Sequence, residues 1–260
     1  MVMRFALVAL CFSACASAQD FISGRYIDLT HPFNEQSIYW PTAETFKKTE
    51  VFKGQTTGGF YYSAYNFSAA EHGGTHMDSP IHFASGAHDT DQVPVSQLIG
   101  PGVVIDVSEQ VAQNVDYRIT ALDIRVFERE HGKIPKGAIV LFNTGRAKLY
   151  PDRLAYMGTD ERGSQAVEKL HFPGLGIDGA KLLVVRGIGA VGLDTPSIDY
   201  GQSKDFASHV ELMTNNIPAF ENVADMSELP PTGAVIIALP MKIEGGSGGP
   251  LRIVAYLPGS

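Results

Sequence analysis

Residues 72–82, with the sequence HGGTHMDSPIH, combine three histidines and one aspartate at a spacing that could bind a metal ion. His76, Asp78 and His82 are separated by even numbers of residues, so an extended backbone would direct their side chains to one face. Imidazole nitrogens and carboxylate oxygens are ligands that first-row divalent metals prefer. The segment therefore predicts a metal site.

Two neighbouring features favour convergence of these side chains. The Gly73-Gly74 pair permits a tight turn that could bring the imidazole of His72 towards the same face. Pro80 favours an extended conformation for the residue before it and blocks continuation of a helix. A single histidine is more often structural than a ligand, but three of the eight histidines of the chain share this window with an aspartate. We therefore favour a metal-binding or catalytic role.

Residues 1–18 have the three parts of a secretory signal peptide. Arg4 provides the positive charge, a short apolar run follows, and Ala16-Ser17-Ala18 forms the small-residue cleavage pattern. The apolar run is too short to span a bilayer comfortably, which argues against a membrane anchor. We expect removal of this leader and a secreted or periplasmic location.

Both cysteines of the chain, Cys11 and Cys15, fall within the leader. The mature protein would then contain neither disulfides nor thiolate ligands. Nitrogen and oxygen groups are the ligands that remain, and a covalent mechanism through a cysteine is excluded. A Gly-x-Ser-x-Gly nucleophile elbow is not indicated either: residues 245–249 (GGSGG) have the letters of that pattern, but their composition is that of a glycine-rich loop rather than of a strand-to-helix turn.

The mature chain of about 240 residues is long enough for one large domain with a complete core. The formal net charge of −8 argues against nucleic acid or an anionic membrane as a partner. No Pro/Ser-rich linker, composition break or internal repeat divides the chain. We expect a single domain over residues 19–260.

Short apolar runs predict strands, and apolar residues at helical spacing predict helices. The expected strands are Arg25–Leu29, Tyr61–Phe67, Val103–Val107, Ala138–Asn143, Leu182–Arg186, Ala234–Ala238 and Arg252–Leu257. The expected helices are Ala121–Glu130, with Thr120 as its N-cap, Ser164–Leu170 and Asp205–Thr214. Strands that alternate with helices indicate a mixed α/β domain with one continuous core. The glycine-rich residues 245–249 predict a loop that could lie near the site.

The pattern His72-x-Gly-Thr-His76-x-Asp78-x-Pro80-x-His82 resembles the signature of the metal-dependent cyclase family, which includes bacterial kynurenine formamidase and isatin hydrolase. The similarity extends over nearly all of the mature chain, from residue 27 onward. This resemblance implies a compact α/β domain of the swivelling β/β/α type. It also implies a homo-oligomer, either a dimer or a tetramer.

The resemblance also implies a role for each matched residue. His72, His76 and Asp78 match the ligands of a first metal ion, and Asp78 and Glu221 match carboxylates that can bridge two ions. His209 matches a ligand of the second ion, and His82 matches the proton donor and acceptor. Trp40 resembles an aromatic residue that lines the substrate pocket, with a plain core aromatic as the alternative. The implied cofactor is one or two divalent ions, zinc or manganese. The full set of expected site residues is His72, His76, Asp78, His82, His209, Glu221 and Trp40.

The implied activity is hydrolysis of a non-peptide amide C–N bond in a small aromatic substrate by metal-activated water. Two substrates compete within the family: the formamide of N-formylkynurenine, which we favour because of Glu221, and the cyclic amide of isatin. A secreted protein that binds a small molecule or a metal without catalysis is the alternative from another class.

Overall fold

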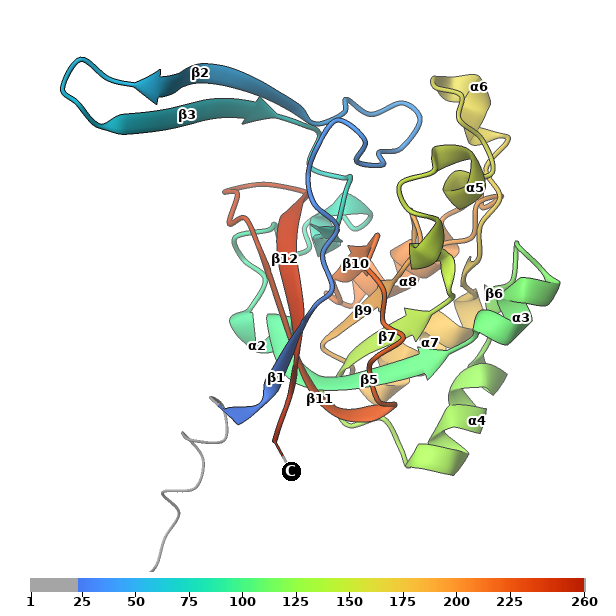
Figure 1. Cartoon of the computed structure of the whole chain (residues 1–260). Helices are drawn as coiled ribbons and strands as arrows, with labels where there is room; N and C mark the ends of the chain where they lie inside the picture. The colour runs from blue at the N-terminus through green and yellow to red at the C-terminus, as the bar shows by residue number, and fades with distance from the viewer. Residues whose placement is uncertain (1–22, 260) are drawn as a thin grey trace, which may run out of the picture.

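The computed structural model describes residues 23–259 (Figure 1). The expected leader and both cysteines lie outside the described residues. Eight strands form the main sheet, and β4 pairs with β12 as well as with β10, so that seven of the strands close into a barrel. In sheet order the strands are β1 (Arg25–Asp28), β12 (Gly248–Leu257), β11 (Thr232–Pro240), β5 (Ile99–Asp106), β7 (Ile139–Asn143), β9 (Ala190–Leu193), β10 (Ala219–Glu221) and β4 (His76–Asp78).

The strands β5, β7, β9 and β10 run parallel, and the chain returns between them through helices that cover the outside of the barrel (Figure 1). The helices are α2 (Val95–Leu98), α3 (Ser108–Gln113), α4 (Ala121–His131), α5 (Arg153–Met157), α6 (Ser164–Val167), α7 (Ile177–Arg186) and α8 (Ala207–Thr214), with 3-10 turns η1 (Pro80–His82) and η2 (Arg146–Leu149). Two further pairs, β2 (Lys47–Gln55) with β3 (Tyr61–Ser68) and β6 (Arg118–Ile119) with β8 (Gly174–Leu175), lie apart from the main sheet.

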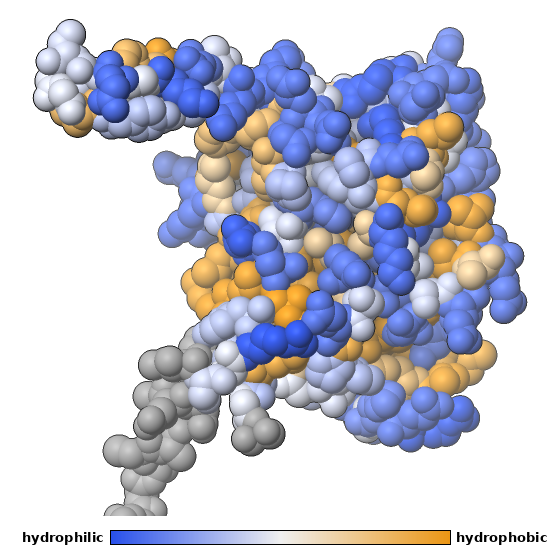
Figure 2. All heavy atoms as spheres, in the orientation of Figure 1, coloured by the Kyte–Doolittle hydropathy of each residue, from blue (hydrophilic) through white to orange (hydrophobic). Residues whose placement is uncertain are grey.

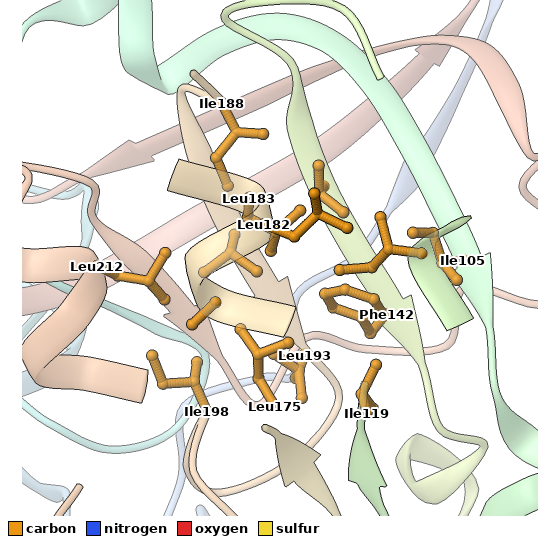
Figure 3. Close-up of a cluster of buried hydrophobic side chains, with 14 of the residues drawn as sticks. Ile105, Ile119, Phe142, Leu175, Leu182, Leu183, Ile188, Leu193, Ile198 and Leu212 are labelled. Atoms are coloured by element: carbon orange, nitrogen blue, oxygen red, sulfur yellow. The ribbon is translucent and has the colours of Figure 1, made fainter. Parts of the chain in front are cut away.

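Alternate side chains of the barrel strands enter two different hydrophobic clusters. On β5, Val104 belongs to the cluster that contains Met77, Phe220 and Ile253 and fills the barrel, whereas its neighbours Val103 and Ile105 belong to the cluster beneath the helices. Figure 3 shows part of this outer cluster around α7. This alternation arises because successive side chains of a strand point to opposite faces of the sheet. The same alternation determines which side chains of β4 and β10 face outward.

The expected mixed α/β domain is confirmed, and six of the seven expected strands are present. Leu182–Arg186 is not a strand, because it forms the second half of α7. Ala180, Leu182 and Leu183 are buried at helical spacing, while Val185 is exposed. A short apolar run in a helix that packs on a sheet is not distinguishable by composition from a buried strand.

The expected helix after Thr120 is confirmed, and its first turn explains why it begins there. The Thr120 hydroxyl accepts from the amide of Asp123, and the Asp123 carboxylate accepts from the amide of Thr120 at 2.7 Å, which is a capping box. The other two expected helices are present but shorter, as α6 and α8. Within residues 23–259, no helix is both long and apolar enough to cross a membrane.

Candidate metal centre

The antiparallel pair β4–β10 forms the floor of the site. His76 lies directly opposite Glu221 in this pair, and Met77 lies opposite Phe220. Because Met77 and Phe220 point into the barrel, His76, Asp78 and Glu221 all project from its outer surface. All three side chains are buried beneath the segments that cover this face.

His76 is held by a backbone carbonyl and directs its other nitrogen at two carboxylates. Its Nδ1 lies 2.9 Å from the carbonyl oxygen of Gly74, to which it donates. Its Nε2 lies 3.1 Å from Asp78 Oδ1 and 3.5 Å from Glu221 Oε2, yet this buried atom has no hydrogen-bond partner. The expected turn at Gly73-Gly74 is confirmed, since Gly74 adopts a φ of 58°.

His209 reaches the same carboxylates from α8. Its Nδ1 donates to Asp199 Oδ2 at 2.6 Å, and its backbone amide donates to the same oxygen at 3.0 Å. Its Nε2 lies 3.2 Å from both Asp78 Oδ2 and Glu221 Oε1. A carboxylate behind the ring is the usual support for a metal-binding histidine.

His72 completes the group from the turn before β4. Its Nδ1 lies 2.6 Å from Asp78 Oδ1, and its Nε2 lies 2.8 Å from the hydroxyl of Ser247. Ser247 donates in turn to Glu71 Oε2 at 2.7 Å, so its oxygen is free to accept from His72 Nε2. The glycine-rich loop that contains Ser247 therefore lies beside the site.

These hydrogen bonds assign the same arrangement to all three rings. In its neutral form, each imidazole donates away from the centre and directs the lone pair of its other nitrogen at Asp78. His76 and His209 also face Glu221. Lone pairs and carboxylate oxygens repel one another unless a positive charge lies between them. A divalent cation supplies that charge, so the residues present fit a metal ion.

The electrostatics of the buried groups agree with this conclusion. Burial lowers the pKa of His76, but without a cation in the site the adjacent carboxylates of Asp78 and Glu221 outweigh burial and raise the pKa to about 9. Burial and the nearby charge of Asp78 raise the pKa of Glu221. Two carboxylates in one low-dielectric site repel each other. The raised pKa of His76 and the raised pKa of Glu221 both indicate a negative electrostatic potential that attracts cations.

The nitrogen and oxygen atoms form two possible ligand groups that share Asp78. One contains His76, Asp78 and Glu221, and the other contains His72, Asp78 and His82; in each, the ligand atoms lie within 4.8 Å of one another. The structure thus brings together all six of the expected His, Asp and Glu residues of the site.

His82 does not lie on an extended strand with His76 and Asp78, as the even spacing predicted. Ser79 is extended, but Pro80 then begins the 3-10 turn η1, because proline suits the first position of a helical turn. The turn stacks the ring of His82 on that of His72, with centroids 3.8 Å apart. Desolvation by the surrounding protein lowers the pKa of His82 to about 4, so the ring is neutral near pH 7.

A cavity of about 280 Å³ opens above these groups. Aromatic side chains form much of its wall, and the expected pocket residue Trp40 is one of them. The ring of Trp40 lies 6.5 Å from Phe172 and 6.4 Å from Phe206. A flat aromatic molecule would be enclosed on several sides with one end at the metal-binding groups.

Sequence reasoning missed several residues of the site. Phe206 lines the cavity in a left-handed conformation with φ of 48°, which is uncommon for a bulky residue and leaves no sequence signal. Asn222 lies beside Glu221, also with positive φ, and donates to the Gly74 carbonyl oxygen at 2.8 Å. Asp199 ends the segment Asp194-Thr195-Pro196-Ser197-Ile198-Asp199, whose acidic and proline residues were a detectable signal.

The chain is similar in sequence to hydrolases of known activity. The family model described as a putative cyclase matches residues 27–200. An isatin hydrolase of Roseibium aggregatum is 34% identical over 227 residues, which cover 84% of this chain and 82% of that protein. A kynurenine formamidase of Bacillus anthracis is 24% identical over 233 residues, which cover 89% of this chain and 97% of that protein.

Solved structures with the same fold are also similar. An isatin hydrolase bound to the product analogue thioisatinate superposes with a TM-score of 0.83 at 28% identity, covering 94% of this chain and 100% of that one. Isatin hydrolase A from Ralstonia solanacearum gives a TM-score of 0.81 at 32% identity, covering 90% and 92% of the two chains.

Proposed function

From the premise that this chain belongs to the Cyclase family, we propose that it is a metal-dependent hydrolase that cleaves a non-peptide amide C–N bond of a small aromatic substrate. The observation that carries the proposal is the buried, unpartnered Nε2 of His76, which faces Asp78 and Glu221 at the base of an aromatic cavity. A site of this kind combines cation binding with access for a flat molecule.

We assign His72, His76 and Asp78 to a first divalent ion and Asp78, Glu221 and His209 to a second, with zinc or manganese as the metal. Both metals accept imidazole and carboxylate ligands. When bound, such an ion acts as a Lewis acid that polarises the amide carbonyl and makes water more acidic. The hydrogen bonds from Nδ1 of His76 and His209 hold these rings in one orientation.

His82 is the proton donor and acceptor in this proposal. Its ring faces the cavity and stacks on His72, and at neutral pH it is uncharged. It can therefore accept a proton from the attacking water at a ring nitrogen and deliver it to the departing nitrogen of the amide, a step typically worth about 10²–10⁴-fold in rate. Trp40 and the neighbouring aromatic residues orient the ring of the substrate.

Two substrates are candidates. Glu221 supplies the second carboxylate that a two-ion arylformamidase needs, which favours hydrolysis of N-formylkynurenine to kynurenine and formate. The higher identity to an isatin hydrolase, 34% against 24–30% for kynurenine formamidases, supports opening of the cyclic amide of isatin as the second candidate.

The test compares both substrates with mature protein loaded with zinc or manganese. We expect turnover of at least one substrate, and a loss of about 10²–10⁴-fold in kcat for His82→Ala at unchanged metal content. His131→Ala, at the exposed end of α4, is the matched control and keeps full activity. Unchanged turnover by His82→Ala contradicts its role. Activity on neither substrate overturns the substrate assignment and favours a binding protein without catalysis.

We also propose a secreted or periplasmic location after removal of residues 1–18, and assembly as a dimer or tetramer. The composition of the first 18 residues supports the location. N-terminal sequencing of protein secreted by the native host tests it, with a new terminus near residue 19 as the expected result.

A further inference from the structure

Residues 194–199, which follow β9, are all buried and form part of the cavity wall. Hydrogen bonds to distant parts of the chain fix their backbone. The carbonyl oxygen of Thr195 accepts from the amide of Asn222 at 2.8 Å, and the amide of Ile198 donates to Glu221 Oε1 at 2.9 Å. The second of these bonds connects the segment directly to a carboxylate of the metal centre.

The polar side chains of this segment are hydrogen-bonded, with one exception. Asp194 and Asp199 each accept from backbone amides with both carboxylate oxygens. The hydroxyl of Thr195 donates to the carbonyl oxygen of Ser197 at 2.7 Å. The hydroxyl of Ser197 itself has no hydrogen-bond partner within residues 23–259.

A hydroxyl without a protein partner is ordinary at the outer surface, where water completes its hydrogen bonds. Figure 2 shows that much of one face of this molecule is hydrophilic in this way. Ser197 does not lie at such a surface, because it is only 5% exposed and lines the cavity above the metal-binding groups. Its donor is therefore available to a molecule that occupies the cavity.

The surroundings of this hydroxyl favour binding over reaction. A serine nucleophile needs a base at about 2.6–3.2 Å to take its proton. Within the described part of the chain, neither His82 nor any carboxylate accepts a hydrogen bond from Ser197. A neutral hydroxyl of this kind suits an uncharged acceptor such as a carbonyl oxygen.

The other groups of the cavity leave one part of the substrate without a partner. In the proposed reaction the metal-binding groups account for the amide carbonyl, His82 for the proton, and Trp40 for the aromatic ring. Both candidate substrates also carry a ketone on the ring carbon next to the one that bears the amide nitrogen. A ketone oxygen only accepts hydrogen bonds, so it matches the free donor of Ser197.

We propose that the hydroxyl of Ser197 donates a hydrogen bond to this ketone oxygen and makes the site selective for aromatic amides with an ortho carbonyl group. Ser197 is then a specificity-determining residue, because a substrate without the ketone would leave the buried donor unpaired. This inference rests on the proposed amide hydrolysis and names the feature that the two candidate substrates share.

The first experiment compares probe substrates that differ only in the ketone. One pair is ortho-acetylformanilide and ortho-ethylformanilide, and the cyclic pair is isatin and oxindole. For metal-loaded Ser197→Ala we expect kcat/KM to fall by about 3–15-fold on the ketone probe and by less than about twofold on the other. The loss should lie mainly in KM, because the hydrogen bond is made in the ground state and the transition state alike.

The matched control is Ser227→Ala, which removes a hydroxyl from an exposed loop and leaves the rates on both probes unchanged. Metal content and circular dichroism verify that each variant keeps its metal centre and its fold. The preference for the ketone probe is a ratio within one variant, so a loss of folded protein cancels from it.

The second experiment measures binding without turnover. Calorimetric titration uses the two amines that hydrolysis of the formanilide pair would release. The ketone-bearing amine should bind Ser197→Ala about 3–15-fold more weakly than the wild type, and the other amine should bind both proteins equally.

An unchanged preference for the ketone in both experiments would overturn the proposal. Equal losses on both members of a pair would also overturn it, since they would assign Ser197 to the amide or to the fold. A wild type that hydrolyses none of the probes would overturn the proposed hydrolysis instead. The titration would then still decide whether Ser197 recognises the ketone.

Discussion

Asp199 determines how His209 faces the metal centre. One carboxylate oxygen accepts from both the backbone amide and Nδ1 of His209, and the other accepts from the amide of Ser208 at 3.1 Å. Both oxygens are occupied by donors, so an amide at this position would direct an NH₂ group at one of them. Asp199 acts on the metal through His209 and is a positioning residue.

We predict that Asp199→Asn weakens binding of the divalent ion by about 10–100-fold, the usual effect of losing such a support. Competition with a chromophoric chelator measures the affinity without reference to activity. Asp205→Asn, which changes an exposed carboxylate near α8, is the control and leaves the affinity unchanged. Equal affinities for both variants would contradict the role of Asp199.

His31 shows how a half-buried histidine outside the metal centre links stability to pH. Its ring stacks on Tyr150 with centroids 3.7 Å apart, and its Nε2 is buried without a hydrogen-bond partner. Burial lowers the pKa of His31 to about 4, although the charge of Asp28 opposes the shift. Below about pH 6.5, the usual pKa of histidine, the unfolded chain binds a proton here that the folded chain does not, so stability falls as the pH falls towards 4.

We predict that the melting temperature of His31→Phe falls less between about pH 7 and about pH 5 than that of the wild type. Phenylalanine preserves the stacking and cannot be protonated. Thermal unfolding in the presence of saturating metal at both pH values measures the difference. Parallel decreases for the two proteins would show that His31 does not contribute to the acid sensitivity.

Among the elements, the turn before β4 sets the position of two histidines at once. Gly74 has positive φ, and a Cβ atom there would lie 2.5 Å from the ring of Phe33. Its carbonyl oxygen orients His76, and Asn222 holds that oxygen from the other side. Substitution at Gly74 therefore disturbs both the backbone and the metal centre.

We predict that Gly74→Ala destabilises the protein by about 1–2 kcal/mol through its left-handed backbone and by a further ~1–3 kcal/mol through the clash with Phe33. Gly59→Ala is the control, because Gly59 also has positive φ but a methyl group added there would meet no atom within 4 Å. Chemical denaturation measures both. A Gly74 variant no less stable than the Gly59 variant would refute the clash.

At the scale of the whole molecule, closure of the barrel places β4 beside both β10 and β12. This closure brings Glu221 opposite His76 and Ser247 beside His72. The converging lone pairs and carboxylates are then costly to assemble without a cation. Metal binding should stabilise the complete fold rather than one segment.

We predict that a divalent ion at about 100 times its dissociation constant raises the free energy of unfolding by about 2.7 kcal/mol and the melting temperature by roughly 5–10 °C. Calorimetry before and after chelation measures the shift, and elemental analysis verifies removal of the ion. His76→Ala should show a smaller shift. An unchanged melting temperature after complete removal would mean that the ion does not bind these residues in the folded state.

The sequence alone predicted the features that depend on neighbouring residues. The cluster at 72–82, the turn at Gly73-Gly74 and the helix start at Thr120 each follow from contacts a few residues apart, and all are present. The strand predicted at Leu182–Arg186 was wrong, because an apolar run does not reveal which neighbour will bury it. The resemblance supplied His209 and Glu221, which local pattern could not connect to the cluster.

Only the tertiary structure decided which distant groups meet. His209 lies 131 residues from Asp78 and Ser247 lies 175 residues from His72, yet each pair is within hydrogen-bond distance. The place where the barrel closes determines which hydrogen bonds support the site, namely those of Asp199, Asn222 and Ser247. It also determines that the β2–β3 hairpin is exposed. Closure is a cooperative result of packing over the whole chain, so no local segment contains the information that specifies it.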